Sequence, residues 1–565
     1  MLSLLSLLTL SVATAQTVPA DAPIERAVSI QVTQTGLDNF GAFLPALIPE
    51  SLAIDDVRQS GGGGFCLAEF ELELGNTAAG MGVEVALEIV DIRFRPVTGR
   101  LNTQIDLLVS INDSGNPFDF NFDVACISGN CAGWVRPFPV TATVPFQLAV
   151  VTAPDGSRVI DATVEPITID NGLNNTHIEL IDSCSTLDTI DSVLAAFNLS
   201  IYDFIIGVVD PFLAGAIDDQ VGDIELQIED ALSAARYEDV IDLAGAELSV
   251  LIEPRDIDIT PGGLTIDLLG AISSPADPCI ADLDPGGSLL TDTLVPEIGD
   301  NPAGTEFIIH VGDELVNQGL YGVWRSGLLC YEISAESEID IGFPIDSSLL
   351  GLLGGEGFED ILPEEPQPIV IVTNPIEAPT ADFEGGYDLT AEVRELGLDI
   401  FTEIDFRQTR ALGLTIEADA GVDIVFDGNT GLLAADIALG PDNITIIATH
   451  NELVVEASAA IEDSVSGLVG VLLDSLVGDA LSGFEFSLPS FEGVGLVTAE
   501  AAPSGDGDWL GLTATIGDVP YEGAGCDEAG GCSGGDTTGG CSSAAGGMGA
   551  ALFLLPLVLV RRRRQ

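Results

Sequence analysis

The chain of 565 residues is long enough for two or more domains, and its 46% hydrophobic content is enough to build folded cores. It carries 90 acidic residues against 17 arginines, has no lysine, and has a formal net charge of −73. Such a chain lacks the basic patches that bind nucleic acid or anionic lipid head groups, so any partner is expected to be apolar, neutral or cationic.

The first 15 residues have the pattern of a secretory signal peptide. A short apolar run is followed by Ala13-Thr14-Ala15, a small-x-small pattern of the kind that signal peptidase recognises. We therefore expect residues 1–15 to be removed after Ala15, so that the mature chain starts near Gln16 and is exported.

Most of the body alternates apolar and polar residues with the period of two that indicates β-strands. Examples in chain order are residues 28–32, 70–74, 83–94, 118–124, 263–270, 307–311 and much of 385–460. Within residues 83–94 the apolar positions change phase between Ile89 and Val90. Such a change predicts a β-bulge or a bend in a strongly curved sheet.

Four apolar segments have helical periodicity instead: residues 36–48, 189–237, 312–327 and 463–483. The second is interrupted at Pro211, which cannot donate the backbone hydrogen bond of a helix interior. Each half of the body thus has a strand, an apolar helix and long strands, which predicts an α+β fold of two curved antiparallel sheets wrapped around apolar helices. The pattern leaves open whether each interior is packed solid or forms an apolar tunnel.

Six cysteines lie in the body, and an even number in an exported protein suits three disulfides. The pairs that we expect are Cys126 with Cys131, Cys66 with Cys184, and Cys279 with Cys330. A zinc site is the weaker interpretation, because the single C-x4-C has no partner pair and the three histidines are scattered. We expect no metal and no cofactor.

The candidate catalytic motifs in the sequence lack the structural context or the partner residues that catalysis would need. The G-x-S-x-G match at residues 531–535 lies in a Gly/Ser-rich tract without a strand before it or a helix after it. His177, His310 and His450 have no serine or cysteine placed to form a triad. Acidic loops such as residues 277–287 lack the ligand spacing of an EF-hand. We expect no enzyme.

The C-terminal tail combines a flexible tether with an apolar segment. Residues 519–543 are rich in Gly and Ser, and residues 544–565 hold an apolar run followed by four arginines at 561–564. The arginines would remain on the cytoplasmic side, which leaves the acidic body outside. A cysteine, a short apolar span and an arginine cluster resemble the MYXO-CTERM type of bacterial sorting tail, with Cys541 as the processed cysteine; a permanent single-span anchor is the alternative. Either way, the body is expected to face outward at the cell envelope.

Four stretches of the body carry family landmarks: residues 28–40 (VSIQVTQTGLDNF), 244–272, 307–333 and 476–516, the last including the FPLP-like turn Phe486-Ser487-Leu488-Pro489. Read in this order, they resemble the bactericidal/permeability-increasing (BPI), lipopolysaccharide-binding and plasma lipid-transfer family, part of the tubular lipid-binding (TULIP) superfamily. The resemblance implies a boomerang of an N-terminal barrel (24–240), a central-sheet crossover (241–304) and a C-terminal barrel (305–518). In that family a disulfide joins an N-barrel strand to the long helix, which makes Cys184 the helix-side candidate and leaves its partner open among Cys66, Cys126 and Cys131.

The resemblance also implies that each barrel holds acyl chains in an apolar groove near the central sheet. The candidate lining residues are Leu37, Phe40, Phe43, Leu44, Val316, Leu320, Val323 and Trp324, each of which could instead be plain core packing. Because the chain cannot build a cationic tip, phospholipid or neutral lipid is the expected cargo rather than lipopolysaccharide. We therefore expect a surface-displayed lipid-binding or lipid-transfer protein; the alternative is a structural or adhesive surface protein with solid barrels.

Overall fold

The structure is a computed structural model. It describes residues 22–43, 83–181, 236–334, 345–354, 366–451 and 494–519 with short gaps, together with isolated short stretches. The signal peptide, most of the helices expected at 189–237 and 463–483, and the tail beyond residue 519 lie outside the described residues. Within the described part, no helix is both long and apolar enough to span a membrane.

The N-terminal half forms a curled antiparallel sheet with the strand order β3-β6-β7-β9-β8-β5-β4, and β10, β11 and β12 also pair with β9. Its strands are β3 (Ser51–Ile54), β4 (Val57–Gly61), β5 (Phe70–Gly75), β6 (Val83–Val97), β7 (Arg100–Ile111), β8 (Phe118–Val124), β9 (Ile127–Thr152), β10 (Arg158–Val164), β11 (Thr168–Asp170) and β12 (Ile178–Leu180). The 26-residue strand β9 pairs along its length with five neighbours, so it sets the curvature of the sheet.

The predicted change of phase in β6 is a β-bulge. Ile89 pairs with Leu107 and Asp91 with Asp106, which leaves Val90 as the extra residue, 64% exposed. On either side of it, Leu87 and Ile92 are both buried. The bulge therefore keeps the apolar residues of both halves of the strand on the inner face, and the prediction is confirmed.

A seven-stranded antiparallel sheet joins the two halves, in the order β13-β14-β15-β2-β17-β27-β26. Its strands are β2 (Ile24–Thr33), β13 (Tyr237–Leu243), β14 (Ala246–Thr260), β15 (Gly263–Ser273), β17 (Phe307–Gly312), β26 (Val494–Pro503) and β27 (Trp509–Asp518). At its middle β2 pairs with β17, and Ile30 lies opposite Ile309. Each of these two strands runs directly into a helix, α1 (Gln34–Phe43) and α4 (Asp313–Arg325). Because the strands are antiparallel, the two helices leave the central sheet at opposite ends.

The C-terminal half is a second curled sheet, ordered β18-β19-β21-β22-β23-β25, with β20 beside β21 and β24 beside β22. Its elements are β18 (Glu332–Ser334), α5 (Ser348–Gly354), β19 (Ile369–Pro375), β20 (Thr380–Asp382), β21 (Leu389–Ile404), β22 (Arg407–Asp427), β23 (Leu432–Ala438), η3 (Pro441–Asn443), β24 (Ile444–His450) and β25 (Glu485–Ser487). A small separate sheet pairs β1 (Gln16–Pro19) with β16 (Gly287–Leu290).

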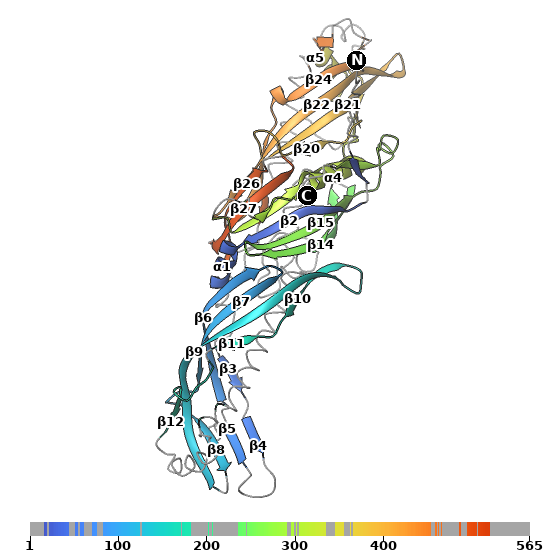
Figure 1. The fold of residues 1–565 in the computed structure, drawn as a ribbon. Coiled ribbons are helices and arrows are strands. Elements are labelled where there is room, and N and C mark those ends of the chain that lie inside the picture. Colours follow the sequence, from blue (N-terminus) through green and yellow to red (C-terminus); the bar gives the residue numbers. More distant parts are fainter. Residues whose placement is uncertain are drawn as a thin grey trace, which may run out of the picture.

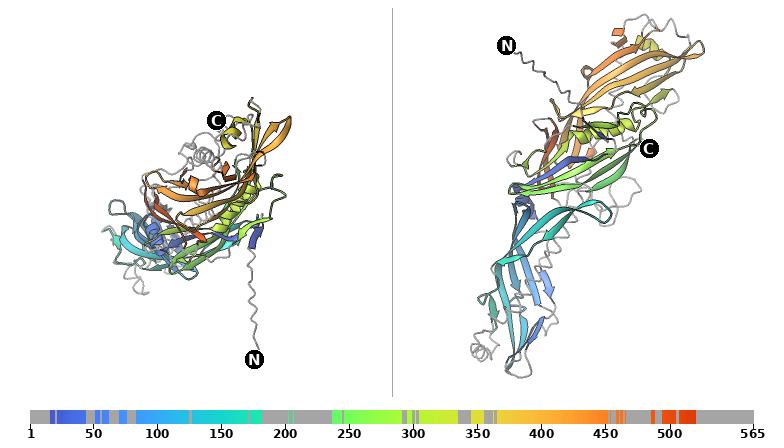
Figure 2. Two further views of the ribbon diagram at one scale, coloured as in Figure 1. Left: turned by 90° about the horizontal axis from the view of Figure 1, so that it is seen from above. Right: turned by 45° about the vertical axis from the view of Figure 1, so that its right-hand side comes forward.

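The molecule is elongated, with the N-terminal sheet at one end, the C-terminal sheet at the other and the central sheet between them (Figures 1 and 2). One apolar core runs from the N-terminal sheet through the central sheet and reaches Phe383 of the C-terminal half. A second cluster, around Leu350 and Leu412, fills the far part of the C-terminal sheet. The two-barrel arrangement expected from the sequence is confirmed.

A substitution of Gly36, in the first turn of α1, tests how closely the two halves pack at their junction. A Cβ added there would lie 2.2 Å from the backbone oxygen of Glu306, which leads into β17. Since backbone cannot move aside cheaply, we expect Gly36→Ala to lower the free energy of unfolding by about 1–3 kcal/mol in denaturant titrations. Gly351→Ala in α5 is the control: its Cβ would meet nothing within 4 Å, and stability should rise by up to about 1 kcal/mol. Equal effects of the two substitutions would contradict this account of the junction.

Candidate functional site

The helix α4 is enclosed by the protein on nearly all sides. Every one of its residues except Val323 and Arg325 is buried. Val316 and Leu320 belong to the apolar core shared with the N-terminal sheet, whereas Trp324 packs with Ile280 and Tyr321 in a small separate cluster. The apolar stripe expected from the sequence therefore faces two different neighbourhoods.

Two buried amide side chains fix α4 to the sheets on either side. The Oε1 atom of Gln318 accepts from the backbone N–H of Ile272 at 2.7 Å, and its Nε2 donates to the carbonyl of Ala22 at 2.9 Å. Asn317 makes the equivalent pair of bonds with the backbone of Ala381 in β20, at 2.8 and 3.0 Å. Because buried amides are costly to leave unpaired, these four bonds hold the helix in one position.

The C-terminal end of α4 is also tied down. The Nε1 of Trp324 donates to the carbonyl of Pro375 at 3.0 Å. Arg325 pairs with Asp284 at 3.0 Å, and Tyr321 donates to the same carboxylate. Burial opposes ionisation of Asp284, but the bonds from Tyr321 and the Gly286 N–H and the charge of Arg325 outweigh it, so its pKa lies below the usual range. The packing around Trp324 is that of a core residue.

The helix α1 makes a more open contact with the N-terminal sheet. Leu37 is buried in the core, but Phe40 is 45% exposed and stacks on Phe94 of β6, with ring centroids 6.1 Å apart. Gly41 allows the close approach, because a Cβ there would lie 2.4 Å from the backbone oxygen of Ile92. We name the surface formed by Phe40 and Phe94 the α1–β6 seam. It is the candidate site for an apolar ligand.

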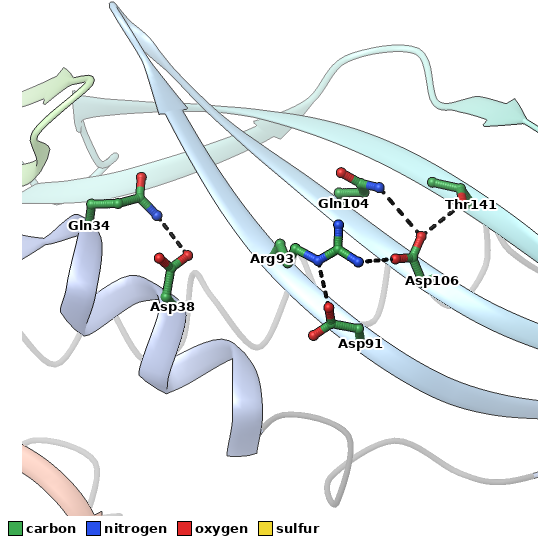
Figure 3. A network of polar contacts seen from close by, with 7 residues as sticks. All are labelled: Gln34, Asp38, Asp91, Arg93, Gln104, Asp106 and Thr141. Carbon is green, nitrogen blue, oxygen red and sulfur yellow. Dashed lines mark hydrogen bonds and ion pairs between the residues drawn. The ribbon is translucent and has the colours of Figure 1, made fainter.

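The wall beside this seam is polar and internally satisfied. Figure 3 shows Arg93 between two carboxylates, those of Asp91 and Asp106, each at 2.5 Å. Asp106 also accepts from Thr141 at 2.8 Å. Arg93 is therefore committed to its own carboxylates, and the seam has no free cation from this network to offer an anionic head group.

His310 is a buried titratable group at the middle of the central sheet. It lies opposite Ser29 on β2 and Gly511 on β27, is 6% exposed, and neither of its ring nitrogens has a hydrogen-bond partner. Burial lowers its pKa to about 4, so the imidazole is neutral at physiological pH. No described nucleophile bonds to it, and its position is that of a structural side chain.

The expected site residues fall into three groups. Leu37, Val316, Leu320 and Trp324 are buried, whereas Phe40 and Val323 are exposed in part. The side chain of Phe43 and the whole of Leu44 lie outside the described residues, as do Ala15 and Cys541. The seam brings Phe40 together with Phe94, which the sequence did not single out as a candidate site residue. The change of phase within residues 83–94, after which Ile92 and Phe94 are the inward-facing apolar residues, was the signal that could have pointed to it.

The predicted pair Cys279 and Cys330 forms a disulfide, which links the segment after β15 to the end of α4. Cys131 is also disulfide-bonded, and its partner is outside the described residues, as are Cys66, Cys126 and Cys184. In the described part, one group of possible metal ligands comes together, namely Asp277 with these same Cys279 and Cys330. Because both sulfurs are in the disulfide, the group offers no thiolate to a metal.

No protein-family model and no characterised protein matches the sequence. Among solved structures the chain is similar to a lipopolysaccharide binding protein, with a TM-score of 0.50 and 12% identity over 88% of this chain and 100% of that one. P47 of Clostridium botulinum E1 has a TM-score of 0.26 and 7% identity over the same shares, and we base no argument on it. At this identity the first likeness shows the fold, which is BPI-like.

His310 makes stability depend on pH. Its folded pKa of about 4 is below the unfolded value of about 6.5, so below pH 6.5 the unfolded chain binds a proton that the folded chain does not. Stability is therefore lost as the pH falls from about 6.5 to about 4, by up to about 3 kcal/mol from this group. We expect His310→Phe to flatten the pH dependence of the unfolding free energy in this window. An unchanged slope would contradict the assignment.

Proposed function

We propose that this chain is a lipid-binding protein displayed at the cell envelope, which holds acyl chains against the apolar inner faces of its two curled sheets. The observation that carries the proposal is the continuous apolar core from the N-terminal sheet into the C-terminal half, in a fold shared with a lipopolysaccharide binding protein. Each buried methylene contributes about 0.8 kcal/mol, so acyl chains can be held without any charged contact.

The cargo is a phospholipid or a neutral lipid rather than lipopolysaccharide. Recognition of a phosphorylated sugar head group needs free cations. Arg93 near the seam is already bound by two carboxylates, and the whole chain has a formal net charge of −73. The apolar seam between α1 and β6, with its partly exposed Phe40, is where acyl chains would meet the protein first.

Display at the cell envelope is supported by three features. The disulfide between Cys279 and Cys330 suits an oxidising compartment. Strand β1 starts at Gln16, so cleavage after Ala15 would leave every described strand intact. The tail offers an apolar segment at 544–565 with its arginines, for retention or for processing at Cys541.

A scaffold with solid barrels is the second candidate, and the packing around α4 favours it. Gln318, Asn317 and Trp324 each bond to backbone of a neighbouring element, which is the pattern of a rigid core rather than of a groove. On this alternative the chain would serve as a structural or adhesive surface protein.

Organic extraction of the purified chain, with lipid analysis and native mass spectrometry, separates the two candidates. We expect about one or two acyl lipids per chain, with phospholipid or neutral lipid as the class. A lipid-free chain that also fails to take up added phosphatidylcholine would refute lipid carriage and leave the scaffold.

A charge in the seam should weaken acyl-chain binding. We expect Phe40→Glu to reduce uptake of a fluorescent phosphatidylcholine at least tenfold, because the carboxylate must be desolvated beside Phe94. Val240→Glu on the edge strand β13 is the control, since Val240 is also exposed, at 55%, but lies away from the seam. Equal uptake by the two variants would place the cargo elsewhere.

A further inference from the structure

The longest hairpin of the C-terminal sheet ends in an unusual turn. Strands β21 and β22 are joined by two residues, Asp405 and Phe406, with Ile404 paired to Arg407 at the base of the turn. Both turn residues have positive φ, 51° and 62°. Turns of this kind favour Asn-Gly or Asp-Gly, because glycine has no Cβ to clash in the left-handed region. A phenylalanine there is strained.

Phe406 is also 96% exposed, more than any other large apolar side chain in the described part of the chain. The hairpin projects at the far end of the C-terminal sheet, away from the central sheet (Figures 1 and 2). The ring therefore contributes nothing to the core and is held at the tip by a backbone conformation that disfavours it. Strain that the fold does not need points to a function outside the fold.

The next residue, Arg407, is one of the few arginines that are not committed to a carboxylate. Ion pairs occupy the guanidinium groups of Arg26, Arg93, Arg100, Arg136, Arg158, Arg236, Arg255, Arg325, Arg394 and Arg410. Among the arginines whose side chains the structure describes, this leaves Arg95 and Arg407, both exposed. With 90 acidic residues in the chain, an unpaired arginine beside the exposed ring is a second, independent feature of the tip.

We propose that the β21–β22 tip docks on a lipid surface with zwitterionic head groups, with the Phe406 ring at the boundary of the acyl chains and Arg407 donating to a lipid phosphate. A lipid surface accepts a single projecting aromatic ring without a matching pocket, and aromatic rings are favoured at such interfaces. Anionic lipid is excluded, because Glu403 and Asp405 flank the tip and the chain as a whole is strongly negative. The proposal does not require the barrels to hold acyl chains.

Insertion of the tip into a lipid surface can be measured in the full-length chain by tryptophan fluorescence. In Phe406→Trp the indole should be quenched by vesicles of brominated phosphatidylcholine. The three native tryptophans give a background measured on the unsubstituted chain. Val425→Trp is the matched control, because Val425 is 51% exposed on the same strand β22 but near its other end. We expect quenching at position 406 and not at position 425. This difference should not depend on whether the C-terminal tail also attaches the chain to the vesicles.

Phe406→Gly separates docking from folding. It creates the favoured Asp-Gly turn, so the melting temperature should stay the same or rise, while partitioning onto phosphatidylcholine vesicles should fall about tenfold. Arg407→Gln should also weaken partitioning, whereas Arg95→Gln, which removes the other unpaired arginine of the described part, should not.

The absence of quenching in Phe406→Trp, or equal vesicle partitioning of Phe406→Gly and the unsubstituted chain, would overturn the proposal. Tighter binding to vesicles that contain phosphatidylglycerol than to vesicles of pure phosphatidylcholine would also overturn it. So would the finding that Phe406→Gly keeps vesicle binding but loses a complex with another protein. The extracted lipid content of Phe406→Gly should be unchanged, so failure of tip docking and failure of lipid carriage are distinguishable.

Discussion

The pairing of β2 with β17 is the contact on which the two-barrel arrangement depends. It brings together residues about 280 positions apart in the chain, and its register puts Ile30 opposite Ile309 on the face that belongs to the core shared with the N-terminal sheet. Ser29 and His310 lie opposite each other on the other face. A slip of one residue would exchange the faces and bury His310 among the apolar side chains of the interiors. The same antiparallel pairing sends α1 and α4 out at opposite ends, so it also determines where the two curled sheets can form.

Local pattern was enough to predict much of this fold. Alternation located the long strands, the change of phase at Val90 located the bulge, and the apolar helices at 36–48 and 312–327 correspond to α1 and α4. The roles of Asn317 and Gln318 could not be predicted from the sequence, because an amide on a helix is ordinarily a surface residue. These two are buried because the fold brings them against backbone groups of β20, β15 and the segment before β2. Phe406 was missed for a related reason: Asp-Phe is not a turn signal, and the two long strands impose the turn on it.

The excess of carboxylates shapes the surfaces as well as the solubility. Arginines such as Arg93 are held by one or two acidic neighbours, and exposed pairs of this kind contribute little to stability, typically about 0–1 kcal/mol each. Their effect is to remove cations from the outer walls. On the proposed function, lipid binding would then rest on apolar contact and on shape, because the net charge of the chain opposes electrostatic attraction to an anionic head group.

The two helices that flank the central sheet occupy equivalent places, yet they differ in how tightly they are held. Helix α4 has its amides, its indole and its terminal arginine all bonded to neighbouring elements. Helix α1 meets β6 through the close approach at Gly41, the half-exposed stack of Phe40 on Phe94, and one bond from Gln34 to the Phe94 carbonyl. A site that admits acyl chains needs apolar surface that can be uncovered without breaking buried hydrogen bonds, since each such break costs about 1–3 kcal/mol. On the α4 side this would break the buried bonds of Asn317, Gln318 and Trp324, whereas on the α1 side the stacked ring of Phe40 makes no hydrogen bond of its own. If the chain holds acyl chains in both halves as we propose, they should therefore enter the N-terminal half more readily than the C-terminal half, which carries the exposed β21–β22 tip.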